Sequence, residues 1–190
     1  MRSSPNSTAL TLMQQPQTVF KVTDIALLTG DTNPIAIVQR MAYALKKKLF
    51  VSPRRGVYAK HGYSFDELAC RLFVPSYLSL EHILQRAGVI FQYGSETTMV
   101  SYLNRTIDVD SRTISYRKIK DEILINPAGI RRGIVNEATT ERAFLDMLYL
   151  NANCHFDNPA AIDKDAVIKL LPIYNSPTLS KRALKILDNA

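Results

Sequence analysis

The side chains best suited to chemistry lie on one side of a segment that the sequence predicts to be a helix, residues 34–47. At 100° per residue, this side carries Ala36, Gln39, Arg40, Tyr43 and Lys47. Gln and Arg can form paired hydrogen bonds with base edges in the major groove, and a small Ala lets a helix approach closely. A solvent-facing helix side also commonly holds Gln, Arg and Lys, so this pattern alone does not establish DNA binding.

The other side of this predicted helix is apolar. It carries Val38, Met41, Ala42 and Leu45, with Ile35 at its margin. We expect this side to face the protein core, which leaves the Gln39 side exposed.

Further candidates for nucleic-acid contacts flank the helix. Thr32 and Asn33 precede it, and Lys46 lies in its last turn. Arg54 and Arg55 lie at the tip of a predicted hairpin, where arginines can reach phosphates or a minor groove. No residue of this set is predicted to be catalytic.

The elements that must position these residues follow one another closely. Thr23 and Asp24 predict the start of one helix, and Gly30 predicts its end. The pair Asn33-Pro34 then predicts the start of the next helix. Two helices joined by a short turn that contains a Gly form the outline of a helix-turn-helix.

A β-hairpin is predicted directly after the second helix. The short apolar segments 49–51 and 57–59 flank the turn Ser52-Pro53-Arg54-Arg55-Gly56. Helix, turn, helix and hairpin follow one another in the order of a winged helix-turn-helix. We therefore predict such a domain over residues 1–60, binding double-stranded DNA.

The net charge of +7 lies entirely within this predicted domain. Residues 1–60 hold nine Lys or Arg and two Asp, whereas residues 61–190 hold 15 basic and 15 acidic residues. Such asymmetry is typical of a polyanion-binding module joined to a neutral domain. A solvated basic face without function would give the same charge distribution.

Residues 61–190 combine helical and strand patterns. Ser64 to Glu67 form a predicted capping box, and Ser79 is a predicted cap for residues 80–87. Further helices are predicted from Thr140, Asp163 and Ser176. The predicted strands are rich in β-branched and aromatic residues and cover 89–91, 97–102, 106–109, 113–116 and 122–125. We predict a mixed α+β domain over 61–190, large enough to bury its own core.

Residues for other kinds of chemistry are sparse. The chain contains no glycine-rich phosphate-binding loop of known spacing. Of the three histidines, only His155 has a neighbouring cysteine, Cys154, and adjacent residues rarely bind one metal ion together. Asp146 lies among apolar residues, which suits a buried and paired acid. We predict no metal, no cofactor and no enzymatic activity.

The sequence also limits where the protein acts. Its longest apolar run is five residues, far short of the roughly 20 that span a bilayer. The N-terminal segment has no apolar core of the length that a secretory signal requires. We therefore expect a cytoplasmic protein in which Cys70 and Cys154 are reduced thiols.

Several segments resemble the AbiEi family of antitoxins, which belong to type IV toxin–antitoxin systems and are related to abortive-infection phage defence. The resemblance covers residues 20–150 and depends on the order and spacing of motifs. Its most specific pieces are Arg55-Gly56-Val57-Tyr58, Pro75-Ser76-Tyr77-Leu78-Ser79-Leu80-Glu81 and Glu141-Arg142-Ala143-Phe144-Leu145-Asp146. The segment after Asn151 has no counterpart that we can place in this family.

The resemblance implies a winged helix-turn-helix that represses its own promoter at inverted repeats. It also implies a C-terminal domain that counters a nucleotidyltransferase-like toxin from the same operon without forming a stable complex with it. The alternative, from another functional class, is an adaptor that uses the basic module to bind RNA or a protein.

Overall fold

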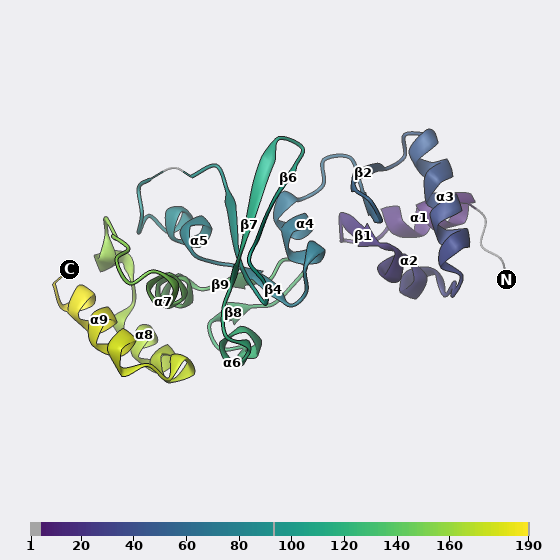
Figure 1. Cartoon of the computed structure of the whole chain (residues 1–190). Coiled ribbons are helices and arrows are strands. Elements are labelled where there is room, and N and C mark those ends of the chain that lie inside the picture. Colours follow the sequence, from purple (N-terminus) through teal and green to yellow (C-terminus); the bar gives the residue numbers. More distant parts are fainter. Residues whose placement is uncertain (1–4, 93, 190) are drawn as a thin grey trace. The chain divides into compact units, whose positions relative to one another are not determined.

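The computed structural model describes residues 5–92 and 94–189 and has an α+β fold (Figure 1), which confirms the predicted class. The chain forms two compact units: the first ends at Leu72 and the second begins at Phe73. The boundary therefore lies later than the one predicted after residue 60. Within the described ranges, no helix is long and apolar enough to cross a membrane.

The first unit combines helices with a small antiparallel sheet. Its elements are α1 (Pro5–Met13), β1 (Val19–Lys21), α2 (Val22–Thr29), α3 (Pro34–Lys46), β2 (Val51–Arg54), β3 (Val57–Ala59) and α4 (Phe65–Leu72). The three strands are arranged in the order β1-β3-β2. β3 is the central strand, where Tyr58 faces Phe20 of β1 and Ala59 faces Val51 of β2.

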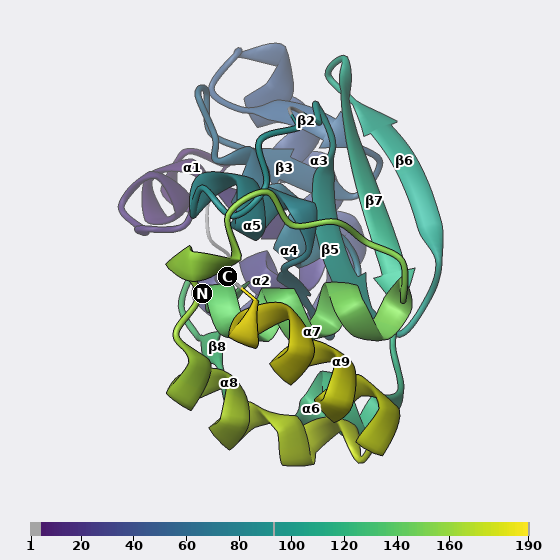
Figure 2. The ribbon, with the colours of Figure 1, turned by 90° about the vertical axis from the view of Figure 1, so that its left-hand side faces the viewer.

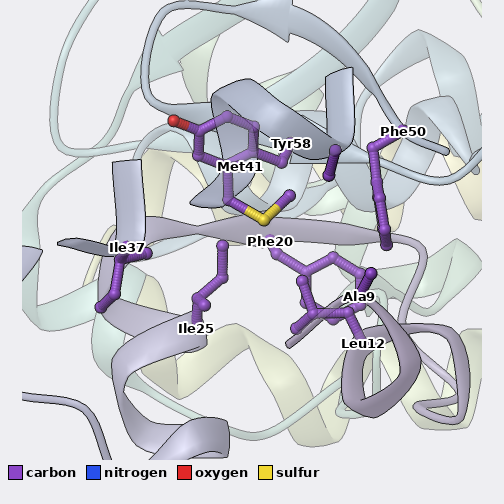
Figure 3. Close-up of a cluster of buried hydrophobic side chains, with 9 residues drawn as sticks. Ala9, Leu12, Phe20, Ile25, Ile37, Met41, Phe50 and Tyr58 are labelled. Carbon is purple, nitrogen blue, oxygen red and sulfur yellow. The ribbon is translucent and has the colours of Figure 1, made fainter. Parts of the chain in front are cut away.

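Apolar side chains from α1, α2, α3, β1 and β3, together with Phe50, form one core (Figure 3). The rings of Phe20 and Phe50 meet edge to face, with centroids 6.5 Å apart. The other buried members are Ala9, Leu12, Ile25, Ile37, Met41, Ala44 and Tyr58. This core fixes which side of α3 remains at the surface.

A buried carboxylate explains why α4 belongs to the first unit. Glu67 accepts hydrogen bonds from Thr18 N at 2.8 Å, Thr18 Oγ1 at 2.6 Å and Val19 N at 3.2 Å. The predicted capping box is therefore only half formed. Ser64 Oγ does accept from Glu67 N at 3.2 Å, but the Glu67 side chain leaves the helix start and binds the beginning of β1.

The second unit is built on a six-stranded mixed sheet in the order β6-β7-β5-β4-β9-β8. β5 pairs in parallel with β7, as does β4 with β9, and the other pairs are antiparallel. The strands are β4 (Ser76–Leu78), β5 (Thr97–Ser101), β6 (Arg105–Val109), β7 (Arg112–Lys118), β8 (Ile130–Arg131) and β9 (Glu137–Ala138).

Helices α5 and α7 pack together on one side of this sheet, and α8 and α9 pack on α7 (Figure 2). The helices of the unit are α5 (Glu81–Arg86), α6 (Asp121–Ile125), α7 (Thr140–Leu150), α8 (Lys164–Leu170) and α9 (Pro177–Asp188), with short 3-10 turns at Pro159–Ala161 and Leu171–Tyr174. The predicted caps of α8 and α9 are confirmed, since Asp163 and Ser176 each accept backbone N–H bonds.

Three predictions for this unit are wrong. Residues 122–125 belong to helix α6 and not to a strand, because Ile123 N and Leu124 N both donate to Lys120 O. Residues 89–91 form no strand, because Val89 O accepts from an irregular segment at Asp157 and Asn158. Ser79 does not cap the helix over residues 80–87, because its hydroxyl points to a buried acid.

That acid is Asp146, fully buried at the centre of the second unit. Its carboxylate accepts from Arg142 Nε at 3.2 Å and Ser79 Oγ at 2.8 Å. It also accepts from the hydroxyls of Tyr77 at 3.0 Å and Tyr174 at 2.6 Å. The prediction that Asp146 is buried and paired is thus confirmed. Burial raises the pKa of this carboxyl, while Arg142 and the three hydroxyls oppose the rise.

The partner of this acid, Arg142, is equally buried, and its remaining N–H groups donate mainly to backbone carbonyls. Its guanidinium donates to Ala128 O at 2.8 Å and Ile123 O at 2.6 Å, and to Tyr77 Oη at 3.2 Å. Gly129 passes so close that an added Cβ would lie 2.9 Å from Arg142 Cβ, and its φ of +73° also favours Gly. The network therefore ties β4, α6, α7 and the Leu171–Tyr174 turn together.

Arg142→Met should destabilise the second unit by about 3–5 kcal/mol, because it leaves a buried carboxylate without its counter-ion. Arg131→Met is the matched control, since the Arg131 side chain is 65% exposed and pairs with Glu137 at the surface. That change should cost roughly 0–1 kcal/mol. Urea unfolding followed by circular dichroism measures both, and equal effects would contradict the structural role of the network.

Candidate nucleic-acid interface

The start of α3 forms as its sequence predicts. Asn33 Oδ1 accepts from Ile35 N at 3.0 Å and Ala36 N at 3.3 Å, and Pro34 occupies the first helical position. Gly30 ends α2 in the left-handed region, with a φ of 68°. The predicted cap Thr23 is wrong, because α2 begins at Val22.

The buried side of α3 is displaced by one residue from the predicted one. Ile37, Arg40, Met41 and Ala44 are buried, whereas Val38 is 44% exposed and Ile35 is 69% exposed. Ala42, also predicted to be buried, is exposed. Of the side chains predicted to face the core, only Met41 is fully buried, and Leu45 is partly buried against the core.

Arg40 accounts for this displacement. Only 9% of this residue is exposed, and its guanidinium forms an ion pair with Asp31 in the loop that joins α2 to α3. Asp31 also accepts a hydrogen bond from Asn33 N at 2.8 Å. That bond and the Arg40 guanidinium lower the pKa of the Asp31 carboxyl. The prediction that Arg40 lies exposed beside Gln39 is wrong, because Arg40 holds the loop against the helix.

Most of the other predicted contact residues on this segment are at the surface. Ala36 is half-buried, and the exposed residues are Thr32, Asn33, Gln39, Tyr43, Lys46 and Lys47. Lys47 Nζ lies 5.7 Å from the centroid of the Tyr43 ring, within the range of a cation–π interaction. These side chains form one surface along α3, which we call the α3 face together with the exposed Ile35, Val38 and Ala42.

The hairpin of β2 and β3 presents its arginines differently. Arg55 is exposed in the turn next to Gly56, which has a φ of 77°, while Arg54 is half-buried at the end of β2. Ser52 Oγ donates to Val57 O at 3.0 Å, which fastens the two strands below the turn. The turn is therefore shorter than the predicted segment 52–56, because β2 extends to Arg54. Arg55 is the more exposed of the two arginines.

Carboxylates are absent from this part of the chain. Between Thr32 and Lys60 the sequence has seven Lys or Arg and no Asp or Glu, and residues 1–72 carry ten basic and four acidic residues, a net charge of +6. Asp24 and Glu67 contact Arg71, and Asp31 contacts Arg40. Asp24, Asp31 and Glu67 thus have basic partners within the unit, and no carboxylate of the segment 32–60 compensates the positive field of the α3 face. Arg2 lies outside the described residues.

The second unit contains a concave site with a volume of about 660 Å³. Its lining includes Cys154, His155, Asp157 and Arg117. Burial raises the pKa of the Cys154 thiol to about 11, so the thiol is neutral and weakly nucleophilic at pH 7. His155 is directed to Asp157, with 3.6 Å between Nε2 and Oδ1. The two neighbours therefore do not form an activated nucleophile and base.

Among residues 5–92 and 94–189, no three His, Cys, Asp or Glu side chains gather closely enough to hold a metal ion. Comparison of the chain with protein-family models and with curated proteins gave no match. The case for a function therefore depends on the residues of the α3 face and on the hairpin.

The Asp31–Arg40 pair should make the stability of the first unit depend on pH. At pH 7, Asp31→Asn should lower the melting temperature, because Asn keeps the bond to Asn33 N but loses the charge. The lowered pKa of Asp31 means that this advantage of the natural residue exists above pH 3.8 and disappears as the pH falls below it. In an Arg40→Met background the difference at pH 7 should shrink. A difference independent of pH and of Arg40 would contradict the assignment.

Proposed function

We propose that the first unit is a winged helix-turn-helix that binds double-stranded DNA, and that the protein is a cytoplasmic autorepressor and antitoxin. The α3 face carries this proposal, since Gln39, Tyr43, Lys46 and Lys47 share an exposed helix surface without carboxylates. Such a surface suits the major groove, where polar side chains meet base edges and lysines meet phosphates.

The order of the elements supports the same proposal. α2, the turn at Gly30 and α3 follow the helix-turn-helix outline, and the β2–β3 hairpin follows as the wing. β1 pairs with β3 and fixes the hairpin to the helical core. With α3 in a major groove, Arg55 at the wing tip would contact the adjacent backbone or minor groove.

The antitoxin part of the proposal depends on the resemblance to the AbiEi family. Two of its most specific motifs, at 75–81 and 141–146, supply Tyr77, Ser79, Arg142 and Asp146 to the buried network. These motifs therefore support a similar C-terminal fold and do not form a catalytic site. The proposed functional partner is a nucleotidyltransferase-like toxin of the same operon, opposed without a stable complex.

One observation favours the alternative, an adaptor that binds a protein or RNA through the same unit. Leu27 on α2 is 84% exposed and Ile35 on α3 is 69% exposed, and exposed apolar side chains also suit a protein partner. Promoter DNA with inverted repeats distinguishes the two functions, because an adaptor would not prefer it over unrelated duplexes.

The Arg54→Ala, Arg55→Ala double variant tests the wing. Removing one phosphate-binding cation lowers the log–log dependence of affinity on salt by about 0.9, so the slope should flatten by roughly 2 and all sequences should bind more weakly. Because Arg54 is half-buried, Arg55→Ala alone should account for more than half of this change. Arg131→Ala with Arg132→Ala in the second unit is the control, and an equal change there would contradict the wing assignment.

Repression and toxin neutralisation should be separable. Residues 73–190 carry 14 basic and 13 acidic residues and have their own sheet and buried network. A fragment that starts at Phe73 should fold, rescue growth against the cognate toxin and fail to repress the promoter. In the full chain, the Arg54 and Arg55 double variant should lose repression and keep rescue. A folded fragment without rescue would contradict separable functions.

A further inference from the structure

Apolar side chains occupy one edge of the α3 face. Ile35 is 69% exposed, Val38 is 44% exposed, and the side chain of Ala42 is also at the surface. At about 100° per residue these three lie within an arc of roughly 60°. They form a continuous apolar strip along the helix, beside Gln39 and Tyr43. The core takes up Ile37 and Met41 on the other side, and the strip is not part of it.

The hydrogen-bonding groups near this strip are restricted. Gln39 adjoins it, whereas the guanidinium of Arg40 is occupied by Asp31 on the buried side. No carboxylate occurs between Thr32 and Lys60, so the pairing of Asp or Glu with the cytosine amino group is excluded there. The lysines at positions 46–48 lie at the far end of the helix, away from the Asn33 end.

These side chains match one kind of base pair in the major groove. Thymine presents a C5 methyl group, which makes apolar contacts, and adenine presents N6 and N7, which pair with a Gln amide. Cytosine would place its amino group against the apolar strip, where a donor without a partner is costly. We infer that α3 recognises A·T base pairs, with Ile35 and Val38 on thymine methyl groups and Gln39 on an adenine. This inference rests on the proposed DNA-binding function.

Charge favours DNA as the occupant of the strip over another protein. Lys46 borders it, Lys47 lies farther around the helix, both are exposed, and the segment 32–60 holds only basic charges. A protein surface would need an acidic rim to match these lysines, whereas every DNA duplex supplies phosphates on both sides of its groove. An apolar strip with lysines at one end thus fits a groove floor that is rich in methyl groups.

The test begins with selection of bound duplexes from a random pool by the full chain. The enriched sites should contain A·T pairs in each half-site. In a selected site, thymines are then replaced by deoxyuridine, which removes only the methyl group. Removal of one methyl group that the protein contacts should weaken binding about fourfold. Replacement at positions outside the half-sites should have no effect.

Variants assign the contacts to residues. In Ile35→Ala and in Val38→Ala, replacing one contacted thymine by deoxyuridine should no longer weaken binding. The affinity of both variants for non-specific DNA should be unchanged. Ile168→Ala is the control, because this side chain is 45% exposed on α8. With this variant, each deoxyuridine replacement should weaken binding as it does with the natural protein. Gln39→Ala should relax the preference for adenine at one position by at least about fivefold. All these side chains are exposed, so the variants should fold.

The outcomes separate this inference from the proposed function. Absence of salt-dependent binding to any duplex would refute DNA binding itself. Salt-dependent binding with selected sites dominated by G·C pairs, or without deoxyuridine penalties, would refute only the A·T inference. Penalties that persist in both Ile35→Ala and Val38→Ala would refute the assignment to these residues. A variant that loses a protein partner but no DNA preference would identify the strip as a protein interface and overturn the inference.

Discussion

The ion pair between Arg142 and Asp146 is the interaction on which the second unit depends. Removing two charges from water is costly, and here the cost is offset because each polar atom of the pair has a partner. Those partners come from β4, α6 and the turn that ends at Tyr174, so the pair can be satisfied only when these elements meet. The same requirement makes Gly129 necessary, since any larger residue would displace Arg142.

Carboxylates have a similar organising role in the first unit. Glu67 binds the start of β1 and thereby attaches α4, and Asp31 binds Arg40 and thereby orients α3. Glu67 lies outside the α3 face, Asp31 adjoins Asn33 at the edge of that face, and both acids are paired or hydrogen-bonded where they lie. The unit thus uses Glu67 and Asp31 for internal structure and leaves Lys46, Lys47 and Lys48 at the surface, a charge arrangement that a DNA-binding face would require.

The arrangement of α3 also links stability to recognition. Because Arg40 is occupied internally, the proposed recognition of bases by this helix would fall to Gln39 and the apolar strip of Ile35 and Val38. A guanidinium would favour guanine, whereas methyl contacts and an amide favour A·T pairs. Under the proposed function, the ion pair between the loop and the middle of the helix would therefore affect both the fold of the loop and the bases that the helix distinguishes.

The sequence by itself determined the features that depend on neighbouring residues: the cap at Asn33-Pro34, the end of α2 at Gly30, the hairpin turn and the starts of α8 and α9. Turns and caps are set by local backbone preferences, so they can be predicted one by one. The exposed side of α3 could not be predicted in this way, because apolar residues cover a wide arc of this helix and their periodicity suits two orientations. Only packing against Ile25 and Phe20, together with the Asp31–Arg40 pair, selected one of them. Likewise, the role of Ser79 and the helix at 121–125 depended on Arg142 and Asp146, which are distant in sequence and meet them only in the folded unit.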